Sequence, residues 1–399
     1  MDAGATRYSS NIFEKGNRTM TRLMIIAAAA AVCLGLAGCG PDKSIAFYNS
    51  GIDAANREDY AEAARLFALS VQHGPRDAEA RYNLGLALFR LRRYAEAEVH
   101  LAEAAAIDPQ DPAARELLGA SLEKQGKLAE AKSAYRASLN IKPTHVPALL
   151  GLASIALAED QNRAAQDYAT EAADLDPNNL DANVLLSEAY FRNGDYNSAY
   201  GQILTAKRLK PSDAAVMLLF GKIAYSRRMY ADALGALADA RALSLSSYDL
   251  FLYLGRTNLA LGALADAERD FRLAIYKNDA GVRAWRGLAE TYIAMKKWPD
   301  AAEAVARASA LEPESPETEI DRAIVAMNTG DIDGAVSDLE AAAARAGAPQ
   351  ITSYYLGHAY LRQGRDAKAL SAFERFLAIW QGESSLREEA RSIVERLRP

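Results

Sequence analysis

The sequence predicts an all-α fold in which helical hairpins stack into a solenoid. Three observations lead to this prediction: a small residue returns every 34 positions, an alanine stands twelve positions after it, and glycines and prolines recur at fixed places around them. A fixed period of this length is typical of supersecondary units that stack around one continuous core. We therefore expect ten repeats, spanning residues 44–383, to form a single array and a single domain.

The small residue stands at position 8 of each repeat, counted from Ser44, and is never larger than serine: Gly51, Gly85, Gly119, Ala153, Ser187, Gly221, Gly255, Ala289, Ala323 and Gly357. Glycine inside a helix costs up to about 1 kcal/mol relative to alanine, so close approach of a second helix must require it. Position 20 is alanine in every repeat, from Ala63 to Ala369. We expect the two small positions to face each other across an antiparallel helix pair.

The turns support this interpretation independently. Five repeats carry glycine seven residues after the small position, where a left-handed residue would end the first helix: Gly126, Gly194, Gly262, Gly330 and Gly364. Proline closes the second helix in several repeats, because it lacks an N–H and clashes with the preceding turn: Pro75, Pro109, Pro143, Pro177, Pro211 and Pro313. Irregular junctions at residues 241–250 and 343–352 predict softer packing there.

Residues 384–399 predict one further helix that caps the last repeat. Ser385 and Glu388 have the spacing of a capping box. The following apolar residues form one stripe at helical spacing: Leu386, Ala390, Ile393, Val394 and Leu397. This stripe would cover the apolar side of the tenth repeat, which would otherwise face water.

The chain begins with a stretch that predicts export. Residues 23–38 are uncharged and mostly apolar, and Arg18 and Arg22 precede them. Because this run is shorter than the roughly 20 residues that a membrane span needs, it is typical of a secretory signal. Either Met1 or Met20 would serve as its first residue.

The apolar run ends in Leu36-Ala37-Gly38-Cys39, which resembles a bacterial lipobox. The resemblance implies that residues 1–38 are a lipoprotein signal peptide, that Cys39 is acylated, and that residues 39–43 are a short tether. The alternative is an ordinary signal peptide with an incidental cysteine. Gly40 follows the cysteine, as in lipoproteins sent to the outer membrane, so we expect the chain in the cell envelope, facing the periplasm.

The repeats resemble the tetratricopeptide repeat family, and the stretch Trp285-Arg286-Gly287-Leu288-Ala289-Glu290-Thr291-Tyr292 is similar to its opening signature. The resemblance covers residues 44–383 without insertion. It implies a right-handed superhelix in which the first helices line a concave groove and the second helices form the convex side.

By the family's geometry, positions 5, 9, 12 and 13 of each repeat point into the groove. The aromatic and basic residues at these positions are our candidates for partner binding: Tyr48, Tyr82, Phe89, Arg90, Lys124, Phe191, Arg192, Lys222, Tyr225, Arg256, Tyr354, His358 and Arg362. Such a surface suits an extended or helical peptide with acidic groups. The alternative is that the rings only pack between neighbouring first helices. The family's clamp for a C-terminal carboxylate is absent, because Tyr48 and Ile52 replace its lysine and asparagine.

Catalysis, cofactors and nucleic acid find little support in the sequence. The four histidines lie in different repeats, without a second histidine or cysteine at metal-binding spacing: His73, His100, His145 and His358. No glycine-rich phosphate loop follows a strand. The net charge of −6 argues against nucleic acid, which is bound through an excess of lysine and arginine. We expect no enzyme activity, no cofactor and no metal.

The function predicted from these features is that of a non-enzymatic, lipid-anchored scaffold. It would bind protein partners in the groove and serve the assembly of an envelope machine for pili, secretion or polysaccharide export. The alternative is an adaptor or regulator of an envelope protease or cell-wall synthase. An enzyme is a third, weaker hypothesis. The sequence identifies neither the partner nor the pathway.

Overall fold

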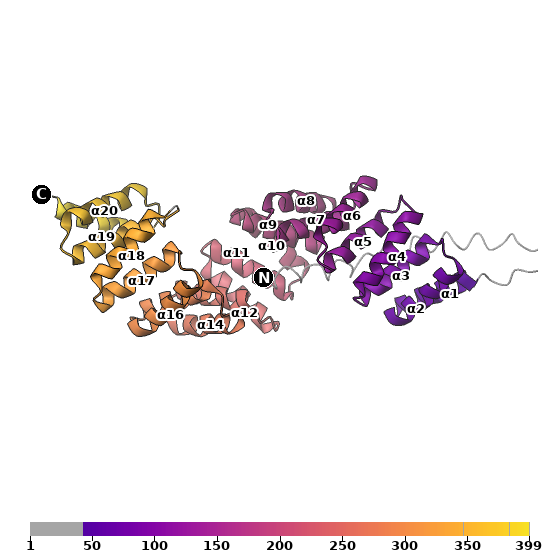
Figure 1. Cartoon of the computed structure of the whole chain (residues 1–399), viewed down its shortest axis with the longest axis horizontal. Coiled ribbons are helices and arrows are strands. Elements are labelled where there is room, and N and C mark those ends of the chain that lie inside the picture. Colours follow the sequence, from indigo (N-terminus) through magenta and orange to yellow (C-terminus); the bar gives the residue numbers. More distant parts are fainter. Residues whose placement is uncertain (1–42, 346, 383, 399) are drawn as a thin grey trace, which may run out of the picture. The chain divides into compact units, whose positions relative to one another are not determined.

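The computed structural model describes residues 43–345, 347–382 and 384–398 (Figure 1). The signal peptide, Cys39 and most of the tether predicted from the sequence lie outside these residues. The described part is helical throughout, and the expected all-α fold of stacked helix pairs is confirmed. The expected single array divides into two compact units, one ending at Pro211 and the other beginning at Ser212, which we call the N-terminal and C-terminal units.

The N-terminal unit contains five helix pairs, and each helix packs antiparallel against the next. Its helices are α1 (Lys43–Asn56), α2 (Tyr60–His73), α3 (Ala78–Arg90), α4 (Tyr94–Ile107), α5 (Pro112–Lys124), α6 (Leu128–Ile141), α7 (Val146–Ala158), α8 (Asn162–Leu175), α9 (Leu180–Arg192) and α10 (Tyr196–Leu209).

The C-terminal unit contains the other five pairs and one further helix. Its helices are α11 (Ala214–Ser226), α12 (Tyr230–Ala242), α13 (Tyr248–Ala260), α14 (Leu264–Lys277), α15 (Val282–Ala294), α16 (Trp298–Leu311), α17 (Pro316–Thr329), α18 (Ile332–Ala344), α19 (Thr352–Arg362), α20 (Asp366–Ile379) and α21 (Ser384–Leu397).

The small residues at position 8 allow the two helices of a pair to pack closely, as predicted. A Cβ atom on Gly85 would lie 2.5 Å from Leu101 Cγ, and one on Gly51 would lie 2.7 Å from Phe67 Cε1. The residue facing position 8 is thus the large side chain at position 24. Position 20 lies close as well, because Ser187 Oγ donates a hydrogen bond to the backbone carbonyl of Ala199 at 2.9 Å.

Every helix pair is joined by a turn with one left-handed residue at position 15. Five of these are the glycines predicted from the sequence, with φ between 70° and 101°. The other five adopt the same conformation with φ between 57° and 60°, although they carry side chains: Glu58, Arg92, Asp160, Arg228 and Lys296. A side chain in this region costs roughly 1–2 kcal/mol, which the packing of the hairpin must offset.

The capping helix α21 covers the last repeat, as predicted. Ala390, Ile393 and Val394 are buried against a cluster that contains Phe373 and Phe376. The predicted capping box is wrong in detail, because the helix begins at Ser384 and Ser385 lies inside it. The stripe of apolar residues, which depends on helical spacing and not on the exact start, is unaffected.

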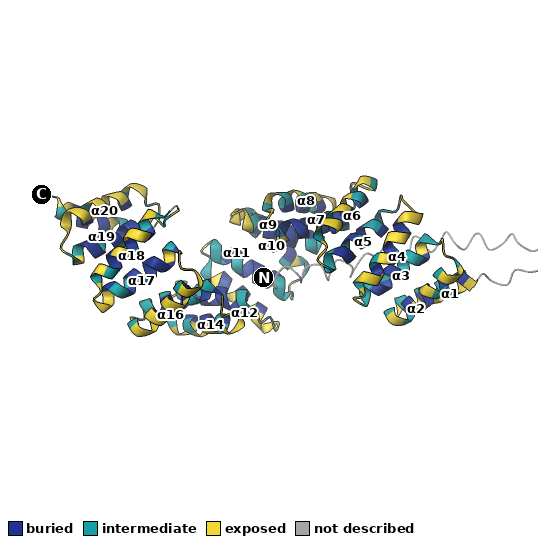
Figure 2. Ribbon diagram, in the orientation of Figure 1, coloured by how far each residue is buried: buried dark blue, intermediate teal, exposed yellow. Residues whose placement is uncertain are grey.

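From α3 onward the first helix of each pair is more deeply buried than the second, as in α7 and α8 of Figure 2, whereas α2 has more buried residues than α1. In α7, for example, most residues are buried, whereas α8 buries only Ala165, Ala169 and Ala172. Successive odd-numbered helices from α3 to α9, and from α11 to α19, also pack on one another, and no pair of successive even-numbered helices in the described part does so to a comparable extent. The odd-numbered helices therefore form the inner layer of each unit.

Candidate partner-binding surface

The tyrosines at position 5 connect successive helices of the inner layer. Tyr48 Oη on α1 donates a hydrogen bond to Glu79 Oε1 on α3 at 2.7 Å and accepts one from Asn83 Nδ2 at 3.1 Å. Burial and the neighbouring Glu79 raise the pKa of Tyr48, so the hydroxyl stays protonated. Tyr82 is half-buried against Ala104, Ala105 and Ala114. These rings pack between neighbouring repeats, as the alternative interpretation stated.

Tyr354 makes the same connection at the end of the C-terminal unit. Its hydroxyl donates to Glu389 Oε2 on α21 at 2.8 Å, and its side chain is buried. Its ring lies 4.6 Å from the His358 ring, which in turn lies 5.1 Å from the ring of Phe373. Burial lowers the pKa of His358, which is therefore neutral near pH 7. Both candidate residues belong mainly to the packing beneath the capping helix.

The aromatic residues at position 12 pack against an aromatic residue at the start of the second helix of the same repeat. Phe89 lies 5.3 Å from Tyr94, Phe191 lies 5.8 Å from Tyr196, and Tyr225 lies 5.7 Å from Tyr230, measured between ring centroids. The partner in each case is position 17. These rings are half-buried, so each retains an edge that a bound partner could contact.

Two arginines at position 13 bind the C-terminal end of the first helix in the preceding repeat. Arg192 Nη1 donates to the backbone carbonyl of Leu157 at 2.8 Å, and Arg362 Nη1 donates to the equivalent carbonyl of Met327. Arg192 also pairs with Glu188 at 2.8 Å. The bonds to the carbonyl groups join each arginine to the last turn of the first helix in the preceding repeat.

Lys222 and Arg90, two further candidate cations, also make contacts within the fold. Lys222 Nζ lies 3.2 Å from Asp249 Oδ2 and 5.7 Å from the centre of the Tyr253 ring. The Arg90 guanidinium lies 5.9 Å from the Tyr60 ring. The expected preference for an acidic peptide therefore loses several of the cations on which it depended.

The other two candidate cations, Lys124 and Arg256, are half-buried on first helices. Burial lowers the pKa of Lys124, which is half-buried at the end of α5. Arg256 is half-buried on α13, and its charge acts on Tyr225 and Glu290. These two cations lie in different units.

The sequence analysis missed a group of acids on α5 of the N-terminal unit. Glu123 Oε2 accepts a hydrogen bond from Tyr135 Oη at 2.8 Å, and its Oε1 accepts one from Ser154 Oγ at 3.3 Å. Glu116, two helical turns earlier, is only 4% exposed. Burial, aided by the charge of Glu123, raises the pKa of Glu116 to about 8. One signal could have revealed it, because position 5 is apolar or aromatic in every repeat except at Glu116 and Arg286.

A second acidic group, also missed, lies on the inner layer of the C-terminal unit and includes a cation. Arg286 on α15 lies 3.4 Å from Glu290 Oε1 and 3.3 Å from Asp321 Oδ2 on α17. Burial raises the pKa of Asp321 to about 7, and the nearby charge of Arg286 opposes this rise. Glu290 and Asp321 thus share one guanidinium.

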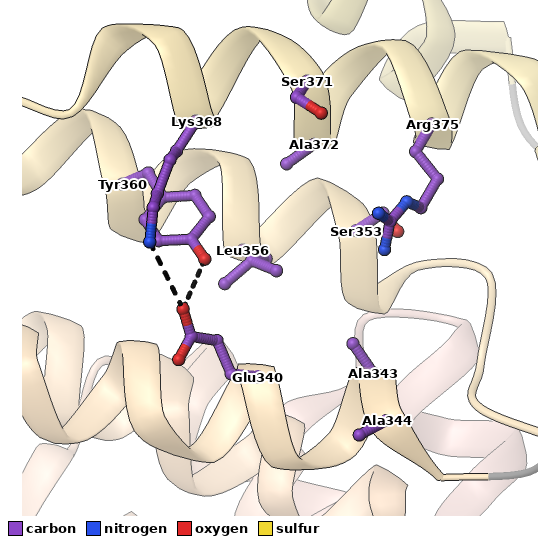
Figure 3. A pocket seen from close by; sticks show the side chains of 10 residues that line it. All are labelled: Glu340, Ala343, Ala344, Ser353, Leu356, Tyr360, Lys368, Ser371, Ala372 and Arg375. Carbon is purple, nitrogen blue, oxygen red and sulfur yellow. Dashed lines mark hydrogen bonds and ion pairs between the residues drawn. The ribbon is translucent and has the colours of Figure 1, made fainter.

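A pocket of about 370 Å³ lies on the side of the second helices, between α18, α19 and α20 (Figure 3). Tyr360 Oη donates to Glu340 Oε1 at 2.6 Å, and Lys368 Nζ lies 3.9 Å from the same oxygen. A pocket of about 230 Å³ occupies the equivalent place two repeats earlier, where Arg272 replaces Glu340 and Asp300 replaces Lys368. The two pockets therefore have the same frame and opposite charges.

In the described part of the chain, no group of three or more histidine, cysteine, aspartate and glutamate residues is placed to hold a metal ion. Among the same residues, no helix combines the length and apolar character that a membrane span requires.

Comparison with protein-family models gives tetratricopeptide repeat matches over residues 48–112, 113–145, 218–282 and 320–384. A model described as anaphase-promoting complex, cyclosome, subunit 3 matches residues 158–240. No curated protein matches the chain.

Several solved structures are similar in fold. A chain of the APC/C Cut9–Hcn1 hetero-tetramer is 15% identical with a TM-score of 0.51, and the match covers 89% of this chain and 78% of that one. PilF of Pseudomonas aeruginosa is 18% identical with a TM-score of 0.49, covering 54% and 99%. A repeat protein from Parabacteroides merdae is 15% identical with a TM-score of 0.47, covering 62% and 98%.

Proposed function

The chain belongs to the tetratricopeptide repeat family, and from this premise we propose that it is a scaffold that binds protein partners on the inner layers of its two units. Proteins of this family generally serve as interaction scaffolds. The observation that carries the proposal is the inner layer itself, where half-buried aromatic and charged side chains recur at positions 5, 9, 12 and 13. Rigid helices that present such side chains suit the recognition of an extended or helical segment.

Photo-crosslinking tests this surface directly. A photo-reactive amino acid placed at Ala158 or Ala294, both exposed at position 13 of a first helix, should crosslink to a discrete protein in intact cells. The same amino acid at Val99 or Tyr276, which are 54% and 83% exposed on second helices, serves as the control. Equal crosslinking at all four positions, or crosslinking at the second helices alone, would contradict the proposal.

We further propose that the scaffold is lipid-anchored in the cell envelope, at the outer membrane facing the periplasm, where it serves assembly of an envelope machine. The support is the apolar leader that ends in Leu36-Ala37-Gly38-Cys39. Cys39→Ser should move the protein from the membrane fraction to the soluble fraction. Cys33→Ser, which changes the other cysteine of the chain inside the leader, is the matched control and should leave the protein on the membrane. Membrane association of the Cys39→Ser protein would argue against the anchor.

A further inference from the structure

The acids on α5 surround a tyrosine ring whose position is fixed by two glycines. A Cβ atom on Gly119 would lie 2.8 Å from Tyr135 Cδ1, and one on Gly151 would lie 2.3 Å from Tyr135 Cζ. The ring of Tyr135 is therefore held between α5 and α7. Its hydroxyl meets Glu123 at 2.8 Å. We call Glu116, Glu123, Tyr135 and Ser154 the acid seam.

Glu116 is the member of the acid seam whose carboxyl group has no hydrogen-bond or ion-pair partner among the described residues. It is 4% exposed, and no hydrogen bond or ion pair joins it to any residue that the structure describes. The charges of both Glu116 and Glu123 raise the pKa of Tyr135, and Glu123 alone accepts a hydrogen bond from its hydroxyl. A buried carboxyl group without a partner is costly, because its charged form loses hydration without compensation.

The fold does not require these acids. Four repeats later, in the C-terminal unit, Gly255 and Gly287 hold the ring of Phe271 in the same way, with Cβ distances of 2.8 Å and 2.3 Å. There Leu252 and Leu259 stand at the positions of Glu116 and Glu123. The ring is thus held in the same way with leucines at the places of Glu116 and Glu123, although Glu290 stands at the place of Ser154, so packing of the hairpin does not require the two acids of α5.

The C-terminal unit also shows how inner-layer acids are satisfied on this scaffold. Arg286 from α15 lies between Glu290 and Asp321, at 3.4 Å and 3.3 Å. A guanidinium suits this role because its donors match carboxylate geometry. The acid seam also has two carboxyl groups on the inner layer, both on α5, but no described residue contributes such a cation to Glu116.

We propose that the acid seam receives an arginine or lysine side chain of the bound protein partner, which supplies the cation that Arg286 provides within the C-terminal unit. This inference rests on the proposed function, since it names a feature of the partner on the same inner layer. It reverses the charge expected from the sequence alone, where an acidic peptide was predicted.

A charge-deletion cycle tests the proposal with the full chain in detergent. A random-sequence peptide library is selected on the protein, and each selected peptide is remade with citrulline, the neutral analogue of arginine, in place of its arginine or with norleucine in place of its lysine. We expect one such exchange to weaken binding at least roughly tenfold, because it removes the cation that pairs with the carboxyl groups of the acid seam. In the Glu116→Gln, Glu123→Gln double variant, the same exchange should cost at most about twofold. An arginine-to-lysine exchange in the peptide then distinguishes a guanidinium from an ammonium site.

The matched control is Glu130→Gln, which removes an exposed acid from α6 and should preserve the tenfold loss. Helical circular dichroism confirms that each variant is folded. If selected peptides bind but the exchange costs as much in the double variant as in the unchanged chain, the inference is overturned and the proposed function stands. If the library yields no peptide that binds the chain, both the proposed function and this inference are overturned.

Discussion

The acid seam and its equivalent around Phe271, four repeats later, have the same arrangement of glycines around a ring. They differ in the side chains that lie beside the ring. In the N-terminal unit, Gly119 and Gly151 enclose Tyr135 beside two acids; in the C-terminal unit, Gly255 and Gly287 enclose Phe271 beside leucines. The two glycines and the ring determine how closely the helices approach each other. The helices approach equally closely in both seams. Glu116 and Glu123 are therefore additions to a frame that packs equally with leucines at their places, and an addition that lowers stability is best explained by binding.

The largest expected effect tests whether both seams depend on their ring. Phe271→Ala and Tyr135→Ala should each lower the free energy of unfolding by about 3–5 kcal/mol, because each leaves a cavity between two helices. Tyr276→Ala changes a tyrosine that is 83% exposed and should alter stability by at most about 0.5 kcal/mol. Chemical denaturation measures all three. A much smaller loss for Tyr135→Ala than for Phe271→Ala would show that the two frames are not equivalent.

A second test exchanges the residues at position 5 of the two seams, Glu116 and Leu252. Glu116→Leu should raise the free energy of unfolding by about 1–4 kcal/mol near pH 8, since it replaces a buried acid by the apolar residue that the other seam carries. Leu252→Glu should lower it by about 3 kcal/mol or more, because it buries a carboxyl group without a cation. Hydrogen exchange of the amides in α5 and α13 reports the two seams separately. Destabilisation by Glu116→Leu would mean that Glu116 is already satisfied within the fold.

Glu116 should make the stability of the chain depend on pH. Burial raises the pKa of Glu116 from 4.5 to about 8, so the folded state keeps a proton that the unfolded state releases above pH 4.5. Stability therefore falls as pH rises from 4.5 towards 8, by up to roughly 1.4 kcal/mol for each pH unit, and levels off above 8. Melting temperatures of the unchanged chain and of Glu116→Gln, compared across this range, measure the effect. Parallel curves would exclude a raised pKa for Glu116.

A smaller change in stability is expected when Arg286, the cation between Glu290 and Asp321, is removed. Arg286→Met should lower the free energy of unfolding by about 1–3 kcal/mol, because Asp321 is buried and loses its partner. Adding Asp321→Asn should recover part of this loss. Additive effects of the two substitutions would indicate that the pair does not interact.

The smallest effects are expected in the turns that both units share. Arg92→Gly should raise stability by about 0.5–1 kcal/mol, because its φ of 59° suits glycine, and Gly126→Ala, where φ is 77°, should lower it by about 1 kcal/mol. Thermal melting of the two variants is sufficient. Stabilisation by Gly126→Ala would show that the left-handed turn is not retained.

The sequence predicts the frame of this fold well, because the frame depends on residue size at fixed spacing. Glycine at position 8, alanine at position 20 and the glycines at position 15 all lie where the periodicity places them. The left-handed Arg92 was not foreseen, since the hairpin and not the residue imposes that conformation. The division after Pro211 was not foreseen either, because Pro211 and Gly221 occupy their regular positions on either side of it.

The binding surface is less predictable, because a residue's position in a repeat does not reveal its partners. Arg192 and Arg362 stand at a groove position, but each donates to a carbonyl of the preceding repeat. The aromatic and basic candidates did not include Glu116, whose burial is a property of the folded chain. Comparing position 5 across all ten repeats would have identified it as an exception.

The most direct test of this account is the free energy of unfolding of the unchanged chain and of Glu116→Leu, each with and without a saturating arginine peptide from the library selection. The account predicts that Glu116→Leu is the more stable without peptide, and that the peptide stabilises the unchanged chain more than the variant. The opposite order without peptide, or equal stabilisation of both proteins by the peptide, would contradict it.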